Sequence, residues 1–130
     1  MSEVEKELEL SDEALNDLKH MEKTSLRRKY NTLYFAAYHA ARARLISLEY
    51  APKTHSGLDS LVHNILVQDE EILTEEEAST FSKLKTRREQ ADYETGFYGT
   101  EEEFLELKEK TNELIRKLKK NEPNSGKFEG

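Results

Sequence analysis

The sequence predicts an all-α fold, an antiparallel up-and-down bundle of about five helices. Apolar residues recur at helical spacing along most of the chain, and Thr-Glu-Glu-Glu, a helix-start signal, occurs twice, at Thr74 and Thr100. No segment alternates apolar and polar residues as a strand does. We expect one helical domain over residues 1–120 and a disordered tail over residues 121–130, which has almost nothing to bury.

The first predicted helix covers residues 3–20. Its apolar residues follow a near-heptad spacing, which is typical of an amphipathic helix: Val4, Leu8, Leu15 and Leu18. Ser11 and Asp12 are good N-cap residues, so we expect the helix to be frayed or interrupted there.

The second predicted helix, over residues 26–50, is the one around which the chain is organised. It contains no Gly or Pro, and Ser25 is its candidate N-cap. One apolar stripe marks a core face: Tyr30, Leu33, Tyr34, Ala37, Ala41, Leu45 and Leu48. A second stripe lies elsewhere on the helix: Phe35, His39, Arg42 and Ile46. A helix with apolar groups on two faces belongs at the centre of a bundle or against a partner chain, so the second stripe is a candidate dimer interface.

Pro52 ends this helix and begins the loop Pro-Lys-Thr-His-Ser-Gly over residues 52–57. A short third helix follows, with Ser56 or His55 as its expected N-cap. Its apolar face is marked by Leu58, Leu61, Val62, Ile65 and Leu66.

The fourth helix is predicted from Thr74 to about residue 93. Its inward stripe contains one charge, Arg88, among apolar residues: Ala78, Phe81, Leu84 and Ala91. A charge on the core side needs a partner or a function, whereas Arg87 can face water. Thr100 opens a fifth helix to about residue 120, with acidic residues at its start and basic ones at its end, as the helix dipole favours.

Composition excludes several classes of protein. The chain has no cysteine, so it has neither disulfides nor thiolate chemistry, and no apolar run approaches the ~20 residues of a membrane span. We expect a cytoplasmic location. The net charge is −7, but residues 22–53 carry +5 and residues 83–90 carry +3. If these basic segments are neighbours in the fold, they make a local positive surface suited to phosphate. The alternative is that they are ordinary solvated faces.

Two groups of residues could carry function. His39 lies on the second stripe, and His55 lies beside Lys53 in the loop that begins with Pro52. Each histidine is either structural or part of a binding site. Arg88 and Asp92 are four residues apart and can pair across one turn, next to Tyr93. We find no metal-ligand spacing, glycine-rich phosphate loop or catalytic triad pattern. We therefore predict that the protein binds neither a metal nor a cofactor, and we assign no catalytic residue.

Three segments occur in order: YFAAYHAARA at 34–43, PKTHSG at 52–57 and RREQADY at 87–93. Together they resemble the HEPN superfamily, specifically an uncharacterised prokaryotic branch with YYAxFHA, KTHSG and RxxADY motifs. This resemblance implies an antiparallel helical bundle that forms homodimers. It also implies an association with nucleotide or RNA binding, toxin–antitoxin systems and a minimal nucleotidyltransferase partner.

HEPN ribonucleases carry an Arg followed, after four to six residues, by a His. Here the position after four residues from Arg88 is Tyr93, and no histidine follows Arg87. Tyrosine, with a pKa of about 10, replaces imidazole poorly in acid–base cleavage of RNA. We therefore expect a binding module, non-catalytic or weakly catalytic. Its candidate nucleotide- or RNA-binding residues are Arg88, Asp92, Tyr93, Lys53, His55 and His39.

Two alternatives stay open. The first is a metal-independent ribonuclease acting at a dimer cleft, with His39 or His55 joining Arg88. The second is purely structural, with Arg88 and Asp92 forming a buried ion pair and the second stripe serving only as a dimer seam.

Overall fold

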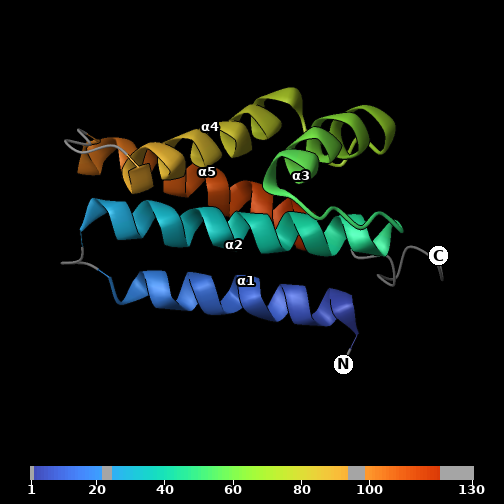
Figure 1. Cartoon of the computed structure of the whole chain (residues 1–130), viewed down its shortest axis with the longest axis horizontal. Coiled ribbons are helices and arrows are strands. Elements are labelled where there is room, and N and C mark those ends of the chain that lie inside the picture. Colours follow the sequence, from blue (N-terminus) through green and yellow to red (C-terminus); the bar gives the residue numbers. More distant parts are fainter. Residues whose placement is uncertain (1, 22–24, 94–98, 121–130) are drawn as a thin grey trace.

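The computed structural model describes residues 2–21, 25–93 and 99–120, except for the side chain of Tyr93. Within these ranges it contains helices and no strand, which confirms the all-α prediction. The elements are α1 (Glu3–Lys19), α2 (Leu26–Ser47), α3 (His55–Leu61), the π-helix η1 (Val62–Asp69), α4 (Glu75–Tyr93) and α5 (Glu101–Lys120). Figure 1 shows the four long helices side by side, with α3 and η1 at one end of the bundle. The predicted disordered tail lies outside the described residues.

Helix α2 is the centre of the bundle, as predicted. It contacts α1, α3, α4 and α5, and half of its residues are buried. Five of its buried residues are alanines, whose small side chains let the neighbouring backbones approach closely: Ala36, Ala37, Ala40, Ala41 and Ala43. The first predicted stripe forms the core, together with Phe81 and Leu84 of α4 and Phe104 and Leu114 of α5, except that Leu48 is only partly buried at its edge.

The predicted interruption of α1 is wrong, because the helix runs unbroken from Glu3 to Lys19. Ser11 is fully buried, and its hydroxyl donates a hydrogen bond of 2.8 Å to the carbonyl of Ala36 in α2. A serine hydroxyl that has a partner on a neighbouring helix does not compete with its own backbone, so the helix continues through it.

The N-cap of α3 is Thr54, not Ser56 or His55 as predicted. The Thr54 hydroxyl accepts a hydrogen bond of 2.9 Å from the backbone N–H of Gly57. A Cβ at position 57 would lie 2.8 Å from that hydroxyl oxygen, so glycine allows the close approach. The other candidate, His55, becomes the first residue of α3.

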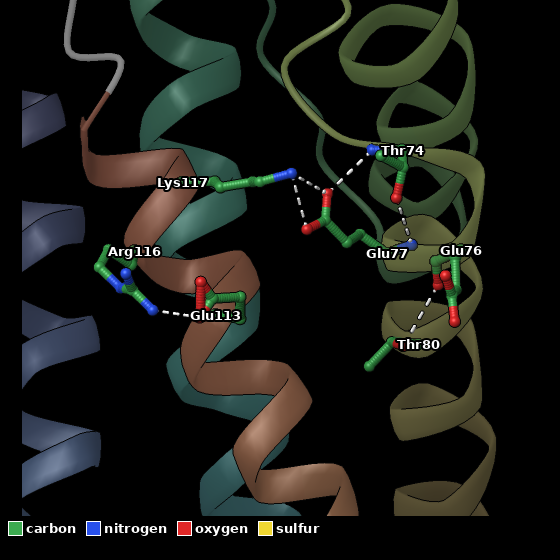
Figure 2. Close-up of polar contacts among 7 residues, drawn as sticks. All are labelled: Thr74, Glu76, Glu77, Thr80, Glu113, Arg116 and Lys117. Carbon is green, nitrogen blue, oxygen red and sulfur yellow. Dashed lines mark hydrogen bonds and ion pairs between the residues drawn. The ribbon is translucent and has the colours of Figure 1, made fainter.

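The capping box that begins α4 is confirmed, and α5 reinforces it. The Thr74 hydroxyl accepts from the N–H of Glu77 at 3.1 Å, and the N–H of Thr74 donates to Glu77 Oε1 at 2.9 Å. Lys117 of α5 reaches the same carboxylate, with Nζ 2.9 Å from Oε2 (Figure 2). Burial raises the pKa of Glu77, but the hydrogen bonds from Thr74 and the Lys117 charge outweigh it, and the pKa is lowered overall.

We predict that Glu77→Gln lowers stability by about 1 kcal/mol at pH 7, because glutamine keeps the cap but loses the ion pair with Lys117. A lowered pKa in the folded state means that the carboxylate stabilises the fold above pH ~4.5 and less as the pH falls through the folded pKa. Urea unfolding at pH 7 and pH 3 measures this: the variant should differ from the wild type mainly at pH 7.

Glu76→Gln is the matched control, because the Glu76 side chain is exposed and only its backbone carbonyl is engaged, by the Thr80 hydroxyl (Figure 2). Both variants remove one acidic group from the first turn of α4. Equal losses in the two variants would show that the helix dipole, and not Lys117, explains the effect.

Candidate functional site

Arg88 lies half-buried on α4, on the side that faces α2. Its Nε is 3.2 Å from Asp92 Oδ2 and 3.4 Å from Asn31 Oδ1. The carbon of its guanidinium lies 5.4 Å from the ring centre of Tyr34 and 5.3 Å from that of Phe35, which are cation–π distances. The charge that the sequence places on an apolar stripe therefore has both a carboxylate partner and an aromatic surface.

His55 lies on the same aromatic surface. Its Nδ1 is 2.7 Å from the hydroxyl of Tyr34, and its ring centre is 4.6 Å from that of Tyr38 and 5.9 Å from that of Phe35. We call Tyr34, Phe35, Tyr38 and His55 the aromatic cluster. Tyr34 is buried, whereas the other three are half-buried. The cluster brings together α2 and α3, and Arg88 of α4 lies over it.

The imidazole of His55 is neutral at pH 7. Burial lowers its pKa below the ordinary value of 6.5, and the charges of Arg88 and Lys85 lower it further. Burial also raises the pKa of the Tyr34 phenol well above its ordinary value, so that hydroxyl keeps its proton at pH 7. The Tyr34 hydroxyl and Nδ1 share one hydrogen bond, whose direction follows the imidazole tautomer.

His39 and Arg42 contact α1 through one carboxylate. Glu7 Oε1 is 2.7 Å from His39 Nδ1, and Glu7 Oε2 is 2.9 Å from Arg42 Nη1. The His39 ring also borders the aromatic cluster, 5.1 Å from Tyr38. Two members of the second stripe are thus bound within the chain, while Phe35 and Ile46 stay half-buried. The sequence analysis missed Glu7, although a carboxylate on the face of α1 that carries Leu18 was a usable signal.

Three other residues from the sequence-based predictions are Lys53, Tyr93 and Arg87. Lys53 is exposed in the loop before α3, and the described contacts do not bring it to Arg88 or His55. Tyr93 ends α4, but its side chain lies outside the described part of the structure. Arg87 does not simply face water: its Nη2 is 2.5 Å from Glu103 Oε2 of α5 and its side chain is 28% exposed, because α5 supplies a carboxylate there.

A polar chain that sequence reasoning did not find ties η1 and α3 to α4. The Ser82 hydroxyl donates to Asp59 Oδ1 at 2.9 Å, and His63 Nε2 lies 2.9 Å from the same hydroxyl oxygen. The serine lies between the other two residues and gives its proton to the carboxylate. This order differs from a catalytic triad, in which histidine lies between serine and the acid.

The two basic segments are neighbours, since the first half of α2 packs beside the last half of α4. Their charge is partly neutralised, because Lys29 pairs with Glu101 and Lys85 with Glu89. Among the described residues, no group of three or more His, Asp or Glu side chains could hold a metal ion. Four surface pockets of about 190 to 550 Å³ are lined by none of the candidate site residues.

We predict that an NMR titration of the His55 ring gives a midpoint below 6.5, and that Arg88→Met raises it without restoring 6.5, because burial is the larger cause. Since the folded pKa is the lower one, the unfolded chain binds more protons below pH ~6.5, and stability falls as the pH drops through that window. Arg116→Met on the exposed side of α5 is the control and should leave the midpoint unchanged. A midpoint at or above 6.5 would contradict the burial of this ring.

No helix in the described ranges is long and apolar enough to cross a membrane.

Comparison with known proteins is consistent with this geometry. No curated protein matches the chain. The model of the HEPN domain matches residues 3–121, which includes every described helix. The chain therefore belongs to the HEPN family.

Proposed function

We propose that this HEPN domain is a dimeric binding module that recognises the phosphate of a nucleotide or an RNA strand at Arg88. The observation that carries the proposal is the way the guanidinium is held. Asp92 and Asn31 engage Nε, and Tyr34 and Phe35 lie against the guanidinium carbon. Nη1 and Nη2 make no hydrogen bond to any residue that the structure describes. Two adjacent N–H donors on an oriented guanidinium fit phosphate oxygens.

The aromatic cluster supports the same ligand class. Phe35, Tyr38 and His55 are half-buried, so part of each ring faces outward. We propose that a base stacks on these rings while Arg88, which lies over Phe35, binds the phosphate. Lys53, His39 and Tyr93 are proposed as further ligand contacts. The binding surface is also the proposed contact for a minimal nucleotidyltransferase in a toxin–antitoxin pair, which follows from the family resemblance.

His55 has one ring nitrogen already engaged. Its Nδ1 shares a hydrogen bond with Tyr34, which leaves only Nε2 to meet a ligand or to act as a general base. No histidine follows Arg87 at the spacing that HEPN ribonucleases use, which favours binding over catalysis. The alternative function, a metal-independent ribonuclease at a dimer cleft, is favoured by one observation: a neutral imidazole and Arg88 share one aromatic surface.

We predict that Arg88→Met weakens binding of a fluorescein-labelled single-stranded RNA about tenfold or more, as fluorescence anisotropy measures it, because the phosphate loses its charged donor. Arg116→Met removes one exposed arginine of α5 and is the matched control. A double variant, Arg88→Met with Asp92→Leu, removes the ion pair without leaving a lone charge. If that variant stays folded and binds like the wild type, the pair is structural and the proposal is wrong.

The same RNA distinguishes a binding module from a ribonuclease when its cleavage is followed on a gel. A binding module leaves the strand intact. A ribonuclease cleaves it, and both Arg88→Ala and His55→Ala then abolish cleavage. Equal cleavage by the wild type and both variants would identify a contaminating nuclease.

We further predict that Phe35→Glu converts a dimer to monomers, because Phe35 is the first residue of the second stripe and glutamate would put a charge into the seam in place of an apolar ring. Phe35 and Ile46 are the half-buried apolar residues of that stripe. Sedimentation velocity measures the change, with Leu105→Glu on α5 as a control that alters an exposed apolar residue elsewhere. An unchanged dimer would exclude this stripe as the seam.

A further inference from the structure

Two hollows lie next to each other on the face formed by α1 and α5. The basic hollow, about 550 Å³, is lined by Leu15, Asn112, Ile115, Arg116, Lys119 and Lys120. The acidic hollow, about 440 Å³, is lined by Glu5, Leu8, Glu9 and Asp12. In Figure 2, α5 lies between α1 and α4, and Arg116 is on its α1 side. None of the lining residues belongs to the candidate nucleotide site.

One ion pair joins the two hollows. Lys119, which lines the basic hollow, pairs with Asp12, which lines the acidic one. This pair puts Lys119 next to Asp12, and the other two cations and two carboxylates line the same two hollows. Each hollow also has an apolar part, since Leu15 and Leu8 are half-buried and Ile115 is buried beneath the first.

We infer that this face binds the same face of a second copy of the chain. A two-fold axis that lies in the interface, between the hollows, places the acidic hollow of each copy on the basic hollow of the other. The two faces together carry six charges of each sign. Within each copy Lys119 pairs with Asp12 and Arg116 with Glu113, and the contact adds groups of opposite charge from the other copy. The leucines of both copies are also removed from water. An acidic peptide would fill only the basic hollow and leave the carboxylates unmatched, so a second copy fits the face better.

The contact is independent of the proposed seam at Phe35, which is on α2. A chain with both contacts assembles into tetramers or larger species, whereas a chain with one forms dimers. The Phe35→Glu variant therefore keeps the α1–α5 contact and reports it alone.

Charge reversal tests the inference. Lys119→Glu with Lys120→Glu reverses the basic hollow, and Glu9→Lys with Asp12→Lys reverses the acidic one. Sedimentation velocity of each double variant in the Phe35→Glu background should show a dimer dissociation constant raised about tenfold or more, because like charges then face each other. The quadruple variant re-creates the pattern with opposite signs at four of the six positions, including the pair between positions 12 and 119, and should return the constant to within about threefold of its parent.

The control is Glu106→Lys with Glu109→Lys, two exposed positions of α5 outside both hollows, which changes the net charge as much as the acidic reversal. Because the chain has no cysteine, each of the variants Glu9→Cys and Lys120→Cys carries a single thiol, and the two variants can be mixed under oxidising conditions. Efficient disulfide formation between the two variants supports the contact. Unchanged association in the reversed variants, an effect equal to that of the control, or no rescue by the quadruple variant overturns the inference.

Discussion

The burial of α2 determines much of the rest of the structure, because its polar groups must find partners on other helices. The guanidinium of Arg44, 4% exposed, donates twice to the carbonyl of Leu118 at the end of α5. The hydroxyl of Tyr34 pairs with His55 of α3, and His39 pairs with Glu7 of α1. Each contact fixes how far a neighbouring helix is shifted along α2. The polar residues of α2 therefore set the register of the bundle, while its alanines set the spacing.

Features that depend on neighbouring residues in the sequence could be predicted. The apolar stripe of α4 and the capping box at Thr74 follow from spacing and local hydrogen bonding, and both are present. Features that depend on a distant partner could not. Ser11 has the chemistry of a helix start and of an interhelical donor, and only the position of Ala36 decides between them. Thr54 competes as a cap with its neighbours, and the backbone angles of the loop select it.

The candidate site shows the same division. Arg88 could be found because a charge on an apolar stripe is a local anomaly, and Asp92 because it is one turn away. The rings on which Arg88 lies come from a helix more than fifty positions earlier in the chain, so their contact depends on how α4 packs against α2. The same packing places Glu103 beside Arg87, which local spacing would leave in water.

The distance between Arg88 and His55 depends on three helices, and two polar ties hold them together. His55 is joined to α2 by Tyr34, while Asp59, further along α3, is joined to α4 by Ser82. Helix α3 thus cannot slide away from α4, which carries Arg88, without breaking one of these bonds. The π-helix that follows continues the contact, with His63 reaching the same serine. If the proposed site binds an anionic ligand, a cation and an imidazole fixed in this way would meet it without rearrangement, which would lower the entropic cost of binding.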